Sequence, residues 1–151
     1  MPLTKQFKIL IVALFIVTTF SGIAGMILVD TLPTILQDYI SQIDNEYASG
    51  EFGILEIILA FAGILSVVVI IGIWQFKNWA RHSYVALSIA LLPFYYIDGP
   101  IIMNPLESLF NDFSFMIDGV LIYMMYLTPL SNEFKLKANK NEETNTNPQA
   151  V

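Results

Sequence analysis

The sequence predicts an all-α integral membrane protein, a bundle of four transmembrane helices. Three observations support this class. Hydrophobic residues make up 56% of the 151 residues, whereas charged residues make up 13%. A soluble domain usually carries about a quarter of charged residues, and the mean hydropathy here is +0.64. The apolar residues also gather into long segments, as a helix needs roughly 20 of them to cross the hydrocarbon core.

Four segments approach the length of a transmembrane helix. They are residues 7–29, 54–76, 79–97 and 113–130. The fourth segment is short, and it lengthens if its helix begins at Pro105, where Asn104 is a suitable N-cap and Glu107 falls in the first turn. Together these spans predict a single membrane domain over residues 1–130.

The first segment also resembles a secretory signal peptide. Lys5 and Lys8 precede its apolar core, and "SGIAG" at 21–25 supplies the small residues of a cleavage site. However, apolar residues continue to Val29, which is long for a cleaved signal. We therefore expect this segment to remain as the first span.

The basic residues predict the orientation. If the N-terminus is cytoplasmic, so are residues 1–8, 77–82 and those after 130. These segments hold every base of the chain: Lys5, Lys8, Lys77, Arg81, Lys135, Lys137 and Lys140. Cytoplasmic loops are enriched in Lys and Arg. We therefore expect a multi-pass protein of the bacterial inner membrane or plasma membrane with both termini in the cytoplasm. Trp74, Trp79 and Tyr84 would lie near the inner interface.

Two further expectations concern the C-terminal tail and the packing of the first two spans. The polar residues 131–151 lack periodicity and predict a disordered cytoplasmic tail. In the first two spans, small residues recur four positions apart, at Ser21–Gly25 and Ala62–Ser66. Because small residues allow helix backbones to approach, we expect these two spans to pack together or against another copy.

The segment between the first two spans predicts an amphipathic helix on the outer surface, over residues 31–48. Its apolar residues follow helical spacing: Leu32, Ile35, Leu36, Tyr39, Ile40, Ile43 and Tyr47. The other side carries the acids Asp38, Asp44 and Glu46. This helix either covers the bundle as a lid that buries Tyr39 and Ile43, which we favour, or presents the three acids to a protein partner.

Four acids lie at or just inside the predicted outer boundary, one for each span: Asp30, Glu56, Asp98 and Asp118. Most have a simple role, since acids cap or stabilise helix N-termini. Asp98 differs because it follows a helix C-terminus, where an anion is disfavoured. No base lies on this side. If Asp98 and Asp118 meet, they need a shared proton, a bound cation or water. The four acids are thus candidates for a proton or divalent-cation site, and solvated helix-end acids are the simpler interpretation.

Enzymatic activity is the least favoured function. The chain has no cysteine and one histidine, which excludes thiolate chemistry and clusters of Cys or His metal ligands. It also has no nucleophile-elbow or P-loop motif. We therefore expect no catalytic residue, no cofactor and no resident metal. A net charge of −6 gives no reason to expect a nucleic-acid partner.

Two function classes remain. The favoured one is a non-catalytic polytopic protein that acts through protein–protein contacts, as an accessory subunit, assembly factor or immunity-type protein. Its partners would be the lipid bilayer and either another protein or copies of itself. The alternative is a homo-oligomeric transporter or channel, coupled to protons or cations through the outer-leaflet carboxylates.

Overall fold

The computed structural model describes residues 1–48, 54–97 and 101–135, and within these ranges the chain is all-helical without a strand. The elements are α1 (Leu3–Ile27), the 3-10 turn η1 (Val29–Thr31), α2 (Thr34–Ala48), α3 (Ile54–Trp74), α4 (Asn78–Ile97) and α5 (Pro105–Leu127). A long helix thus covers each segment predicted to be a span. The fourth takes the longer of its two predicted forms and begins at Pro105.

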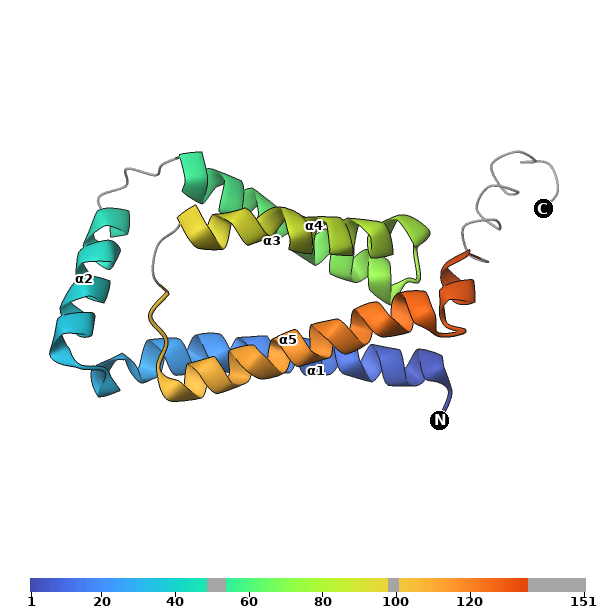
Figure 1. Cartoon of the computed structure of the whole chain (residues 1–151), viewed down its shortest axis with the longest axis horizontal. Helices are drawn as coiled ribbons and strands as arrows, with labels where there is room; N and C mark the ends of the chain where they lie inside the picture. The colour runs from blue at the N-terminus through green and yellow to red at the C-terminus, as the bar shows by residue number, and fades with distance from the viewer. Residues whose placement is uncertain (49–53, 98–100, 136–151) are drawn as a thin grey trace.

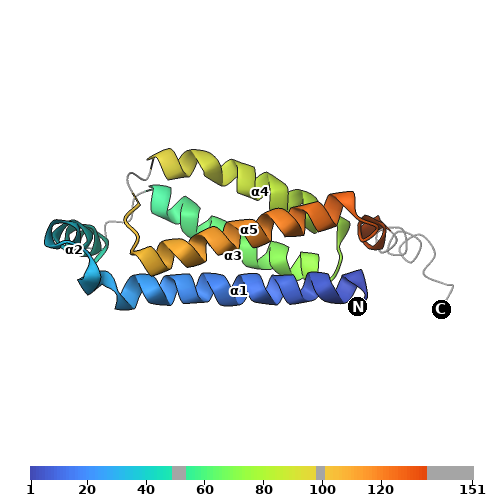
Figure 2. The same ribbon diagram turned by 60° about the horizontal axis from the view of Figure 1, so that its bottom comes forward.

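The four long helices run along one axis as two pairs (Figure 1). α1 packs along α5, and α3 packs along α4. Turning the molecule places α5 between α1 and α4 (Figure 2). α2 stands across one end, which we call the α2 end. The opposite end holds the N-terminus and the α3–α4 turn, and we call it the hairpin end (Figure 1).

The expectation that the first two spans pack together is wrong, because α1 packs chiefly on α5; packing of these spans against another copy stays a prediction. Gly25 explains the choice, since a Cβ there would lie 2.9 Å from Oε1 of Glu107. Ser21, the other small residue of that pair, donates a hydrogen bond to the carbonyl of Glu107 at 3.1 Å. The small residues therefore do admit a neighbouring helix, but that helix is α5.

The start of α5 is fixed by a capping box at Asn104, as the sequence predicts. Oδ1 of Asn104 accepts from the backbone N–H groups of Leu106 at 3.1 Å and Glu107 at 2.9 Å. Oε2 of Glu107 accepts in return from the Asn104 N–H at 3.3 Å. Asn104 is 1% exposed, and its Nδ2 donates to the carbonyl of Ala24 at 2.9 Å. The cap therefore also joins α5 to the last turns of α1.

The turn between α3 and α4 has a Schellman geometry with phenylalanine where glycine is usual. Phe76 has a φ of 58°. The Phe76 N–H donates to the Ile73 carbonyl, and the Lys77 N–H to the Gly72 carbonyl, both at 2.9 Å. A non-glycine residue is rarely found at this backbone conformation. Here the ring of Phe76 is buried in the core, which offsets the cost of the turn.

The core lies at the hairpin end, around three phenylalanine rings. The ring centroids of Phe76 and Phe134 lie 5.2 Å apart, those of Phe7 and Phe76 5.8 Å, and those of Phe7 and Phe134 6.1 Å. The predicted tail therefore does not begin at residue 131: residues 131–135 are helical, and burial of Phe134 holds them against the core. The remainder of the predicted tail, 136–151, lies outside the described residues.

Candidate functional site

A cavity of about 250 Å³ lies midway along the four long helices, and each of them contributes to its wall. Its lining is mainly aliphatic, with Ile11, Leu14, Ile70, Leu87 and Leu91 among the residues. Its polar members are Thr18, Ser66, Tyr84, Ser88 and Asp118. Asp118 is the carboxylate of this cavity, and no base lines it among the described residues.

Asp118 does not lie at a helix end, which corrects its interpretation as a solvated helix-end acid. Because the Asn104 cap starts α5 at Pro105, Asp118 lies roughly three and a half turns into the helix. Its side chain is half-buried. A helix-dipole explanation therefore fails, since that effect falls off within the first turn.

Tyr84 of α4 is the polar partner of Asp118. Its hydroxyl donates a hydrogen bond to Oδ1 of Asp118. The sequence places Tyr84 only near the inner interface, and its bond to Asp118 was not predicted. The available signal was the cost of an acid within an apolar helix, which demands a hydrogen-bonding partner from another helix; nothing in the sequence indicates which tyrosine supplies it.

Each of the other hydroxyl groups of the cavity donates its hydrogen bond to a backbone carbonyl of its own helix. Thr18 donates to the Leu14 and Phe15 carbonyls, at 2.9 and 3.1 Å. Ser66 donates to the Ala62 carbonyl at 2.8 Å, and Ser88 to the Tyr84 carbonyl at 2.9 Å. A hydroxyl has one proton and two acceptor lone pairs. The side chains of the cavity therefore offer acceptors to a ligand and hold no spare donor.

The structure does not bring the other candidate acids to Asp118. Asp30 is exposed in η1, and its carbonyl accepts from Nε2 of Gln37 at 3.2 Å. Glu56 lies in the first turn of α3, but its side chain is outside the described part of the structure, as is the whole of Asp98. The predicted meeting of Asp98 with Asp118 therefore falls outside the described residues. Within them, no group of three or more His, Asp or Glu is placed to hold a metal ion.

A second cavity, of about 520 Å³, lies at the α2 end. Ile40 of α2 lines it together with residues of α1 and with Glu107 of α5. The lid expected to bury Tyr39 and Ile43 is thus partial, since Tyr39 is exposed and Ile43 is half-buried. Ile40 faces this cavity, whereas Ile35 is 75% exposed. Of the three candidate partner contacts, Asp38 is exposed on α2. Asp44 and Glu46 lie on the same helix with side chains outside the described set.

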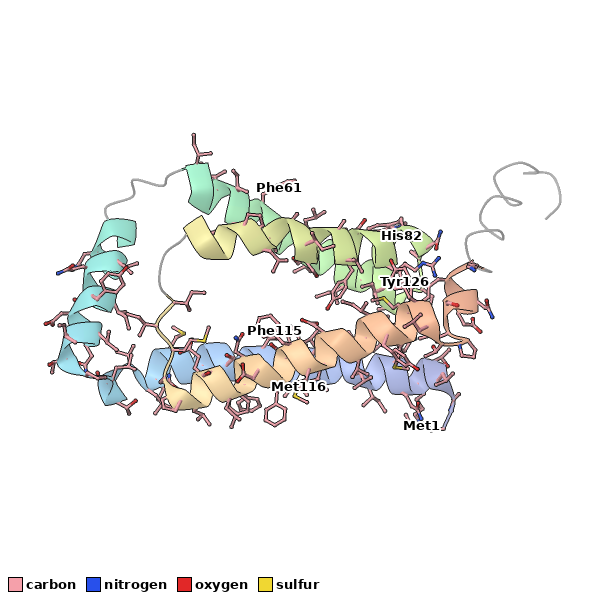
Figure 3. The ribbon with its side chains drawn as sticks, viewed as in Figure 1. Met1, Phe61, His82, Phe115, Met116 and Tyr126 are labelled. Atoms are coloured by element: carbon pink, nitrogen blue, oxygen red, sulfur yellow. The ribbon has the colours of Figure 1, made fainter. Side chains whose placement is uncertain are left out.

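Two helical segments, Leu3–Ile27 and Ile57–Trp74, are long and apolar enough to cross a membrane. This length and composition indicate membrane association. Large apolar side chains also remain exposed on opposite sides of the molecule, where Phe61 and Met116 are each 67% exposed (Figure 3). Comparison of the chain with models of known protein families, with curated proteins and with solved structures gave no match.

Proposed function

We propose that this chain is a non-catalytic, multi-pass membrane protein that binds a small ligand in the cavity at Asp118. The observation that carries the proposal is the presence of one carboxylate in an apolar cavity whose hydroxyl groups act as acceptors. An ionisable residue inside a membrane is costly and is retained mainly for function. The ligand that fits has an apolar body and a cationic, hydrogen-bond-donating group, such as an alkyl- or arylammonium ion.

The membrane arrangement in this proposal has α1, α3, α4 and α5 as four spans. Their exposed apolar side chains would face lipid, and α1 would be retained because Phe7 belongs to the core. Five bases lie in the described residues. Lys5 and Lys8 are in the first turns of α1, Lys77 is in the α3–α4 turn, Arg81 is in the first turn of α4, and Lys135 follows α5. The positive-inside rule then places the hairpin end, with both termini, in the cytoplasm of the inner or plasma membrane.

Single introduced cysteines test this orientation, because the chain has none of its own. Asp38→Cys should react with a membrane-impermeant maleimide added to intact cells, and Lys135→Cys should react after permeabilisation. Both positions are exposed, so accessibility within the fold does not separate them. Equal labelling of the two in intact cells would contradict the four-span arrangement.

Ligand-dependent stability tests the cavity. In detergent, benzylammonium should raise the thermal stability of the protein more than benzyl alcohol or toluene does, because it alone brings a positive charge to Asp118. Asp118→Asn should weaken benzylammonium binding by roughly tenfold or more, the loss expected for a charge-assisted hydrogen bond. If the three compounds stabilise both proteins equally, Asp118 does not recognise a ligand.

The same site supports coupling to protons or cations. Asp118 would then release its ligand when a proton takes the ligand's place, as expected of a small homo-oligomeric transporter. The coupling site in this proposal is Asp118 with its partner Tyr84. It differs from the outer-leaflet cluster expected from the sequence, which consisted of Asp30, Glu56, Asp98 and Asp118. Counterflow of benzylammonium into proteoliposomes, lost in Asp118→Asn, would distinguish transport from binding.

A second proposal is the protein-contact function expected from the sequence. The observation that favours it is α2, which contacts the long helices little and leaves Ile35 and Asp38 exposed. Its partner would present basic groups to Asp38, Asp44 and Glu46, as an accessory or immunity-type interaction requires. The double change Asp38→Lys with Asp44→Lys should abolish co-purification of that partner and leave the helical content intact. Unchanged co-purification would remove α2 as the contact surface.

A further inference from the structure

A groove of about 300 Å³ at the hairpin end combines two lysines with an apolar wall. It is lined by Lys5, Lys8, Ile9, Val12 and Ile16 of α1 and by Trp74 at the end of α3. The spacing of Lys5, Ile9, Val12 and Ile16 places them along one face of α1. The lysines lie in the first turns of the helix, and the apolar side chains continue from them toward its middle. Ile9, Val12 and Ile16 are exposed.

The charged end of the groove is held in place by Trp74. Nζ of Lys8 lies 5.0 Å from the centroid of the Trp74 ring and 5.7 Å from that of Phe76. These contacts keep the ammonium group at the groove rather than free in solvent. No acid lines the groove among the described residues, and the first turn of α1 contains none. The N-terminus of a helix adds partial positive charge to that of the lysines.

We propose that this groove binds one anionic phospholipid, with its phosphate between Lys5 and Lys8 and an acyl chain along Ile9, Val12 and Ile16. Charge complementarity selects the anionic headgroup, and the apolar wall that begins directly beside the lysines selects an acyl chain over a free phosphate. The site rests on the proposed membrane arrangement and is independent of the ligand at Asp118. It differs from general attraction to an anionic surface because the lipid contacts a defined side chain, Trp74.

The two tryptophans of the chain supply a built-in control. Trp74 lines the groove and Trp79 does not, although both are exposed. Trp79→Phe protein therefore reports the groove by its fluorescence, and Trp74→Phe protein reports a nearby surface outside it. Each protein is placed in phosphatidylcholine vesicles that contain a small fraction of a brominated lipid, either phosphatidylglycerol or phosphatidylcholine. In both lipids the bromine atoms lie near the headgroup end of the acyl chains. Bromine quenches a tryptophan that it contacts.

Brominated phosphatidylglycerol should quench Trp74 at a several-fold lower lipid fraction than brominated phosphatidylcholine does, with a much smaller preference at Trp79. Replacing Lys5 and Lys8 by Gln should weaken this preference by roughly fivefold for each lysine, as about 1 kcal/mol per base implies. Lys5→Arg with Lys8→Arg should retain it, and Lys135→Gln, which removes a base outside the groove, should leave it unchanged.

Three results would overturn the site: equal quenching of Trp74 by the two lipids, equal preference at Trp74 and Trp79, or a preference that survives loss of both lysines. Absence of quenching at both tryptophans would overturn the membrane arrangement together with the groove. Failure of benzylammonium binding at Asp118 would leave each of these readouts unchanged, so the two proposals fail separately.

Discussion

The hydroxyl of Tyr84 in α4 donates a hydrogen bond to Oδ1 of Asp118 in α5, and this bond closes one wall of the central cavity. Tyr126 adds a second link between the same helices nearer the hairpin end, where its hydroxyl donates to the Arg81 carbonyl at 3.1 Å. His82 packs edge-on against Tyr126 there (Figure 3). Since α4 and α5 otherwise contact each other little, these hydrogen bonds add to the apolar core at the hairpin end in joining the two helix pairs.

Replacement of Tyr84 by Phe should therefore destabilise the protein more than replacement of Asp118 by Asn. Tyr84→Phe leaves a half-buried carboxylate without its donor, which costs about 1–3 kcal/mol. Asp118→Asn keeps a carbonyl oxygen that can accept from Tyr84, so its cost should be smaller. Thermal unfolding in detergent measures both, and equal stability of Tyr84→Phe and the unmodified protein would show that the bond contributes nothing.

Two glycines three residues apart in α1 should respond differently to alanine. At Gly25 the new Cβ would lie 2.9 Å from the Glu107 carboxylate and disturb the α1–α5 contact. We expect Gly25→Ala to cost about 1–3 kcal/mol, because the Glu107 carboxylate that must move also accepts from the Asn104 N–H in the cap of α5. Gly22 has nothing within 4 Å of such a Cβ, so Gly22→Ala should be neutral or stabilising. Similar unfolding temperatures for the two variants would contradict the observed pairing of α1 with α5.

Asn104 has two separable roles, and two substitutions distinguish them. Asn104→Ala removes both the cap of α5 and the bond to Ala24, so we expect a loss of about 1–3 kcal/mol. Asn104→Asp keeps an oxygen for the N–H groups of Leu106 and Glu107 but cannot donate to the Ala24 carbonyl. The free energy of unfolding of Asn104→Asp should fall between those of the unmodified protein and of Asn104→Ala, as measured by denaturant titration monitored by circular dichroism. A loss as large as that of Asn104→Ala would mean that the cap itself matters little.

Phe134 should be essential to stability although it follows the last long helix. Phe134→Ala opens a cavity beside Phe7 and Phe76, and such a change in a packed core costs about 3–5 kcal/mol. Phe15, which is 72% exposed, provides the matched control, and Phe15→Ala should change the unfolding temperature little in detergent. If the two variants unfold alike, the aromatic cluster is not the core of the protein.

The sequence predicts most of the helices because their signals are local. Apolar length marks the four long helices, and Asn104, Pro105 and Glu107 together specify where α5 begins. The shorter form of that helix, which starts at residue 113, is wrong because it takes Asp112 as the end of the apolar segment, whereas the Asn104 cap sets the actual boundary. For the same reason, the assignment of Asp118 to the first turns of its helix was wrong.

Helix pairing and the candidate site depend on contacts between distant parts of the chain. The small residues Ser21 and Gly25 indicate that a helix approaches α1 closely, but their spacing does not say which one. Tyr84 is of a residue type that is common at membrane interfaces, and its bond to Asp118 depends on how α4 lies against α5. Phe134 was assigned to the tail because the residues around it are polar, and its burial depends on rings contributed by α1 and the α3–α4 turn.

The aromatic cluster also sets an order for the assembly of the chain. Phe7 is synthesised as part of α1, whereas Phe134 follows all four long helices in the chain. The cluster of three rings therefore cannot be completed before α5 has been made, and until then α1 lacks its main packing partner. Contacts of such long sequence separation are slow to form. Docking of α1 against α5 is thus expected to be a late step in the assembly of the four long helices.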